Sequence, residues 1–108
     1  MALAEFQVRR IFRAYWYANC PVTTDIPTEM LSSVFIKQAE KKALVIFSNW
    51  SFEDRTARWQ IDTGKLGFDV KSIYEIDTVT GERRPVALDA LVMSLKSRDF
   101  AIVELSGE

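Results

Sequence analysis

A group of acidic side chains is the part of this chain that could carry hydrolytic chemistry. Hydrolysis of a glycosidic bond needs two carboxylates about 5 to 10 Å apart across a cleft. All but one of the candidate carboxylates fall at expected strand ends or turns, and the group is Glu53, Asp54, Asp62, Asp69, Glu75 and Asp77. A lone small β-domain also offers little concave surface to a substrate. We therefore expect no catalytic residue and no enzyme activity in this chain.

The sequence contains no histidine, which is the common general base in nucleophilic catalysis and the common zinc ligand. Cys20 is the only cysteine and cannot form an intrachain disulfide. We expect it to be a small packed side chain rather than a reactive thiol. Asp62 with Asp69, or Asp77 with Glu82, could hold calcium, but turn capping explains these residues better. We predict no metal site and no cofactor.

The aromatic side chains are the remaining candidates for binding. Indole and phenol rings are flat platforms on which the C–H face of a pyranose can stack. Trp59 alternates with polar residues in register with Ala57 and Ile61, so we expect it in the core. Trp50 follows an apolar segment and could lie on a loop rim. Trp50 is therefore the candidate ligand-binding residue.

Composition bounds the class of protein and its partners. The 14 Lys and Arg residues nearly balance the 15 Asp and Glu residues, which gives a formal net charge of -1. Such a chain has no field that would recruit nucleic acid or an anionic membrane. It also contains no apolar run near the roughly 20 residues that span a bilayer, and no signal-peptide pattern. A content of 48% hydrophobic residues in 108 positions suits one packed domain.

Residues 1–27 differ in character from the rest, and we expect them to form a linker with an aromatic cluster. From Leu3 to Trp16 the apolar residues mix helical spacing with strand-like spacing, so a short N-terminal helix and a strand both remain open. Pro21 and Pro27 disfavour a continuous ladder in the loop between them. The aromatic residues expected to pack against a neighbouring domain are Tyr15, Trp16 and Tyr17.

We expect residues 28–108 to form a β-sandwich domain, because from Leu31 onward the apolar residues recur with a period of two, which predicts strands. The expected strands cover residues 33–39, 43–48, 55–62, 70–76, 85–88, 90–95 and 100–105. The segment 43–48 is apolar on both faces, so we expect a central strand that is covered on both sides. Strands at this spacing predict an all-β fold, an antiparallel β-sandwich of about seven or eight strands of Greek-key type.

Polar segments separate the expected strands. The loop 63–69 contains Gly64 and Gly67, which permit positive φ and allow Leu66 and Phe68 to return to the core. Other residues are expected to hold turns and strand edges without a chemical role, and they are Ser48, Asn49, Asp77, Gly81 and Asp99.

Four segments together resemble the C-terminal β-sandwich that follows the catalytic barrel in many glycoside hydrolases. In chain order they read ALVIFSNWSFEDRTARWQID, LGF, IYEIDTVTGE and LVMSLKSRDFAIVEL. The matching turns are the Ser-Asn pair at 48–49, Thr-Gly-Glu at 80–82 and Arg-Asp-Phe at 98–100. The aromatic start is similar to the linker that leaves the barrel. The resemblance covers nearly the whole chain and implies an accessory domain taken from a longer protein.

The resemblance implies that this domain packs against the catalytic domain of a glycoside hydrolase and stabilises it. The catalytic domain is then the expected partner. Two alternatives remain open. One is a carbohydrate-binding module that uses surface aromatics such as Trp50, with carbohydrate as its partner. The other is a free-standing protein-interaction domain.

Overall fold

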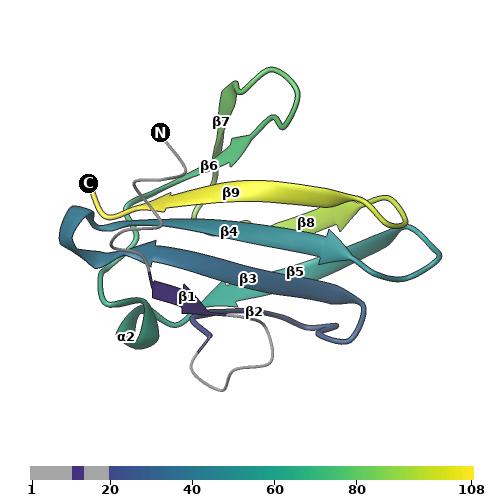
Figure 1. Cartoon of the computed structure of the whole chain (residues 1–108), viewed down its shortest axis with the longest axis horizontal. Coiled ribbons are helices and arrows are strands. Elements are labelled where there is room, and N and C mark those ends of the chain that lie inside the picture. The colour runs from purple at the N-terminus through teal and green to yellow at the C-terminus, as the bar shows by residue number, and fades with distance from the viewer. Residues whose placement is uncertain (1–10, 14–19) are drawn as a thin grey trace.

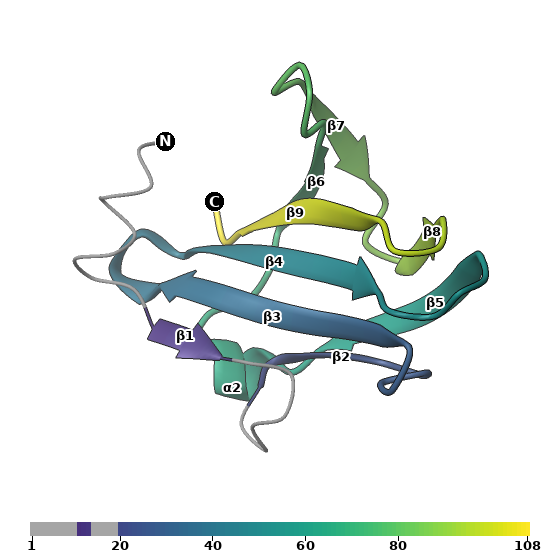
Figure 2. The same ribbon diagram turned by 45° about the vertical axis from the view of Figure 1, so that its right-hand side comes forward.

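Two antiparallel sheets pack face to face in the computed structural model, which describes residues 11–13 and 20–108, with side chains from residue 20 onward (Figure 1). The larger sheet has six strands in the order β1-β3-β4-β9-β6-β7, and the smaller has three in the order β2-β5-β8. The β6–β7 hairpin extends beyond the smaller sheet (Figure 2). The predicted antiparallel β-sandwich is confirmed.

The strands of the larger sheet are β1 (Ile11–Arg13), β3 (Met30–Lys37), β4 (Lys42–Asn49), β6 (Ser72–Ile76), β7 (Arg83–Val86) and β9 (Phe100–Ser106). Those of the smaller sheet are β2 (Val22–Thr24), β5 (Arg55–Ile61) and β8 (Val92–Leu95). A 3-10 turn, η1 (Gln38–Glu40), joins β3 to β4, and the short helix α2 (Thr63–Leu66) follows β5. Within the described residues, no helix is long and apolar enough to cross a membrane.

The segment before residue 28 contributes to both sheets. β1 pairs with β3, so the described part of the 3–16 segment follows the strand alternative. The prediction of a loop without a ladder is wrong at β2, which pairs with β5. Pro21 and Pro27 lie outside the three paired residues, and the Pro21 carbonyl accepts a hydrogen bond from the Asp62 backbone N–H (2.7 Å). Cys20 and Val22 are buried in the core, and the sandwich therefore includes residues 20–24.

The core lies between the two sheets and follows the predicted alternation. On β4, Ala43, Val45 and Phe47 are buried and face the smaller sheet. Trp59 of β5 reaches them from the opposite sheet, with its ring centroid 5.1 Å from that of Phe47. Only 4% of Trp59 is exposed, which confirms the prediction that it is a core residue.

The loop 63–69 returns to the core as predicted, through a helix that the sequence did not indicate. The Asp62 side chain caps α2 by accepting a hydrogen bond from the Lys65 backbone N–H. Gly67 ends the helix with φ of 93°, a left-handed conformation that glycine adopts readily. Leu66 and Phe68 on either side of it are both buried.

Asp77 holds the turn between β6 and β7. Its Oδ1 accepts hydrogen bonds from the backbone N–H groups of Val79 (2.8 Å) and Thr80 (3.0 Å). These bonds favour the ionised carboxylate and lower the pKa of Asp77 below its ordinary value, and the bond from Thr80 has the largest effect. The turn role predicted for Asp77 is confirmed.

The lowered pKa of Asp77 predicts a pH dependence of stability. A carboxylate whose pKa is lower in the folded state stabilises the fold above its unfolded pKa of about 3.9, and this contribution disappears as the pH falls through the folded pKa. Asp77→Asn keeps the acceptor oxygen but cannot ionise. We expect the urea midpoint of the parent sequence to fall more steeply than that of Asp77→Asn between pH 5 and pH 2. Parallel curves would contradict this expectation.

Candidate functional site

Three connections of the sandwich meet at one end, which lies at the right in Figure 1. They are the β2–β3 connection (residues 25–29), the β4–β5 connection (residues 50–54) and the β8–β9 connection (residues 96–99). The exposed side chains of Trp50 and Phe52 lie on the second of these connections, and the Ser97 backbone N–H of the third donates to Asp54 (3.1 Å). Segments from three separate parts of the chain therefore build this end.

Asn49, at the end of β4, holds these connections together from the inside. Its side chain is almost completely buried, with 1% of the residue exposed. The Nδ2 group lies within hydrogen-bond distance of the carbonyl oxygens of Glu53 (2.9 Å), Leu95 (3.0 Å) and Lys96 (3.1 Å). The Oδ1 atom accepts from the backbone N–H (3.0 Å) and the hydroxyl (2.8 Å) of Ser51. The turn role expected of Asn49 is therefore confirmed.

Trp50 and Phe52 project from this fixed backbone into solvent. The Trp50 backbone N–H donates to the carbonyl of Glu29 (2.8 Å), while 60% of the residue is exposed. Phe52 is 85% exposed, and the guanidinium carbon of Arg98 lies 4.5 Å from the centroid of its ring. The predicted surface position of Trp50 is confirmed, and its role in binding a ligand stays a prediction.

Charged groups stand beside these aromatic rings. The Arg55 guanidinium pairs with the carboxylate of Glu29 (Nε to Oε2, 2.8 Å) and with that of Glu53 (2.8 Å). These hydrogen bonds raise the pKa of Arg55 above its ordinary value, and the bond to Glu29 has the largest effect. A shallow depression of about 400 Å³ is lined by Thr28, Glu29, Trp50, Ser51, Phe52, Glu53 and Arg55. We call this depression the aromatic loop site.

Most of the aromatic loop site could not be read from the sequence. Glu29 and Arg55 are 26 positions apart, and only the packing of β2–β3 against β5 brings them together. Phe52 alone could have been noticed in the sequence, because a large apolar residue within a polar connection indicates an exposed aromatic side chain. The predicted packing residues Tyr15, Trp16 and Tyr17 lie outside the described residues.

A second surface lies on the face of the larger sheet that is turned away from the smaller sheet. Six apolar residues on this face are half-buried, and none of the six belongs to the core or packs against it. We call them the outer apolar face, and they are Leu31, Phe35, Leu44, Ile46, Ile76 and Ile102. The register places Ile46 opposite Ile102 and Ile102 opposite Ile76, so these side chains form a continuous row across three strands.

The outer apolar face differs from the usual outward face of an antiparallel sheet, which is polar where it meets water. The sequence predicts that the 43–48 strand is covered on both sides. The smaller sheet covers its inner face, whereas Leu44 and Ile46 lie on the outer one. Polar groups lie next to the outer apolar face. On β9 the nearly buried Glu104 forms an ion pair with Arg83, and the Arg83 guanidinium lies over the Tyr74 ring.

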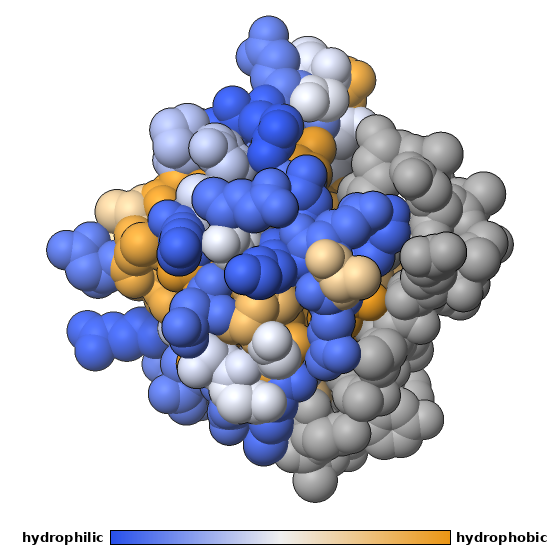
Figure 3. Space-filling model, turned by 90° about the vertical axis from the view of Figure 1, so that its left-hand side faces the viewer, coloured by the Kyte–Doolittle hydropathy of each residue, from blue (hydrophilic) through white to orange (hydrophobic). Residues whose placement is uncertain are grey.

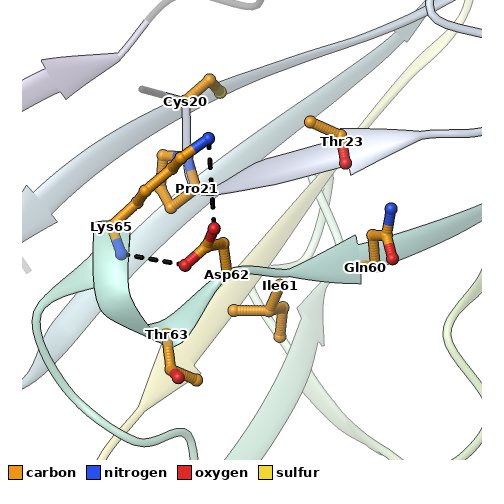
Figure 4. Close-up of a pocket in the computed structure, with 8 residues that line it drawn as sticks. All are labelled: Cys20, Pro21, Thr23, Gln60, Ile61, Asp62, Thr63 and Lys65. Carbon is orange, nitrogen blue, oxygen red and sulfur yellow. Dashed lines mark hydrogen bonds and ion pairs between the residues drawn. The ribbon is translucent and has the colours of Figure 1, made fainter. Parts of the chain in front are cut away.

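A third feature is a depression of about 490 Å³ between β2, β5 and α2 (Figure 4). It is lined by Cys20, Pro21, Thr23, Gln60, Ile61, Asp62, Thr63 and Lys65. Asp62 points toward Lys65, whose backbone N–H lies 3.1 Å and whose Nζ lies 4.0 Å from the carboxylate oxygens. The Cys20 Sγ donates to the Val22 carbonyl (3.3 Å) and is buried. The capping role of Asp62 and the packed state of Cys20 are both confirmed.

The opposite end of the sandwich has a different surface. The β3–β4 turn faces the viewer in Figure 3, and most of the surface drawn in colour there is hydrophilic. Among the described residues, the large exposed aromatic side chains are Trp50, Phe52 and Phe100, which belong to the loop end. The exposed aromatics of the described part therefore gather at one end of the sandwich.

Comparison with known proteins identifies the family. The model of the family described as glycoside hydrolase 123, C-terminal domain, matches residues 3–80, which is more than half of the chain. No curated protein and no solved structure matches. The matched range extends from the N-terminal segment to the β6–β7 turn, and β7, β8 and β9 follow it. The chain belongs to the family of glycoside hydrolase 123 C-terminal domains, and it is an accessory domain of a glycoside hydrolase.

Proposed function

We propose that this domain packs against the catalytic domain of its parent enzyme through the outer apolar face, and stabilises that domain without catalysing a reaction itself. The parent enzyme is the glycoside hydrolase that this C-terminal domain accompanies. The observation that supports the proposal is the row of Ile46, Ile102 and Ile76 on the outward side of the larger sheet. Tyr15, Trp16 and Tyr17 are proposed as further contacts with the catalytic domain.

Burial of this row would stabilise an interface between the two domains. Apolar surface contributes about 25 cal/mol for each Å² removed from water. Interfaces between domains of one chain bury roughly 600–1,500 Å². A sheet face with apolar residues on neighbouring strands can supply the apolar surface of such an interface. Contiguous apolar patches are uncommon on surfaces that stay in water.

The test is thermal unfolding of the parent enzyme with Ile46→Ser and Ile102→Ser together. Removing these side chains from a buried interface should cost about 2 kcal/mol. We therefore expect the melting temperature of the catalytic domain, followed by calorimetry and by loss of activity, to fall by about 4–8 °C. The isolated 108-residue chain with the same substitutions measures any loss within this domain.

Val92→Ser is the matched control, because Val92 is an exposed apolar residue on β8 of the other sheet. It should leave the melting temperature of the catalytic domain unchanged. An unchanged melting temperature in the Ile46 and Ile102 double variant would contradict the proposal. A loss confined to the isolated chain would show that another segment of this chain covers the outer apolar face. A stop codon immediately upstream in the gene would favour a free-standing domain instead.

A further inference from the structure

We propose that the aromatic loop site binds carbohydrate, with a pyranose ring stacked on Trp50 and a neighbouring sugar against Phe52. Glu29, Glu53 and Arg55 would bind the hydroxyl groups. This inference concerns a different surface from the outer apolar face, and it holds whether or not that face contacts a catalytic domain.

The first argument is that the aromatic rings are held on a rigid support. The Trp50 backbone N–H donates to the Glu29 carbonyl, and the backbone N–H of the next residue, Ser51, donates to the buried Asn49 Oδ1. The Ser51 hydroxyl is bonded to the Asn49 Oδ1 (2.8 Å) and to the Glu53 carbonyl (2.7 Å). Little conformational freedom of this connection is left to lose on binding, which favours affinity for a small ligand.

The second argument is the pairing of open rings with ordered hydrogen-bonding groups. A sugar presents apolar C–H faces and polar hydroxyl edges, so it needs both kinds of partner at once. Trp50 and Phe52 supply exposed aromatic surface. The carboxylates of Glu29 and Glu53 accept hydrogen bonds, and Arg55, held between them, donates in a planar geometry.

The third argument is the charge at the site, which favours a neutral ligand. The carboxylates of Glu29 and Glu53 stand with the guanidinium groups of Arg55 and Arg98, so the formal charges of these groups cancel. A site for phosphate or for an acidic polymer would need an excess of donors and positive charge. A neutral glycan fits these four side chains better than either anion.

The experiment is to apply the fluorescently labelled 108-residue chain to an array of immobilised glycans. The soluble form of the glycan bound best is then titrated while tryptophan emission is followed. We expect a saturable change in emission with the unaltered chain. The affinities of the variants are measured by titration calorimetry, whose signal does not depend on Trp50. Trp50→Ala should weaken binding at least tenfold, and Phe52→Ala should weaken it to a lesser extent. Trp59→Phe, which changes a buried tryptophan, should leave the affinity within about twofold.

Two results would overturn the inference. One is the absence of binding to every glycan of the array by the folded chain. The other is binding that Trp50→Ala leaves unchanged, because the sugar would then lie elsewhere. Circular dichroism of each variant shows that it remains folded. If Trp50→Ala lowers the melting temperature of the catalytic domain in the parent enzyme and leaves glycan binding unaffected, the aromatic loop site is a domain contact and the carbohydrate inference is wrong.

Discussion

Replacing Trp59 by alanine should lower the free energy of unfolding of this domain by about 3–5 kcal/mol, the usual cost of removing a buried large aromatic side chain. Trp59 bridges the two sheets and contacts Phe47, which is fully buried on β4. The indole Nε1 has no hydrogen-bond partner among the described residues. The loss therefore comes from packing and from the cavity left behind.

Urea denaturation followed by circular dichroism measures this effect. Trp50→Ala is the matched control, because it removes the same side chain from a position that is 60% exposed. Surface substitutions of this kind usually change stability by no more than about 0.5 kcal/mol. Equal losses for the two alanine variants would show that Trp59 does not hold the sheets together.

The Asn49→Asp substitution should destabilise the domain by about 3–5 kcal/mol at pH 7, although the two side chains have nearly the same shape. The Asn49 Nδ2 group donates toward three backbone carbonyl oxygens, and an ionised aspartate can donate to none of them. The Glu53 carbonyl keeps the Ser51 hydroxyl as a donor, and the Lys96 carbonyl keeps the Asp99 backbone N–H. The main hydrogen-bond loss is therefore at the buried Leu95 carbonyl, and a buried acceptor without its donor costs about 1–3 kcal/mol. The new negative charge would also face these oxygens in a buried site.

The size of the Asn49→Asp effect should depend on pH. Burial and the facing carbonyl oxygens raise the pKa of the new carboxyl group in the folded state, because the neutral form can donate one hydrogen bond. A raised folded pKa means that the penalty is full at neutral pH and shrinks as the pH falls toward the unfolded value of about 3.9. Urea midpoints of the variant and the unaltered chain at pH 7 and pH 4.5 measure this difference.

Gln60→Glu is the control for the amide-to-acid exchange. Gln60 is exposed on β5, so the same change of chemistry occurs in water. We expect a change of about 0.5 kcal/mol or less. If Asn49→Asp is as mild as Gln60→Glu, the buried hydrogen bonds of Asn49 do not organise the loop end. The support assigned to the aromatic loop site would then be lost as well.

Local alternation explains how much of the fold could be predicted. In β5 the period of two separates the buried Ala57 and Trp59 from the exposed Thr56, Arg58 and Gln60, and the prediction of this strand is confirmed. The prediction failed at β2, which contains three residues after Pro21. A strand that short has too little sequence to show a period. It exists because β5 offers it a partner in the folded chain.

The sequence by itself determined the strands after residue 30, the core position of Trp59 and the resemblance to accessory domains of glycoside hydrolases. These depend on alternation and turn residues, which are properties of neighbouring positions. Only the tertiary structure decided which side of β4 meets the smaller sheet and which side carries Leu44 and Ile46 outward. It also joined Glu29 to Arg55 beside Trp50. Such pairings depend on the packing of distant segments, and local periodicity does not encode them.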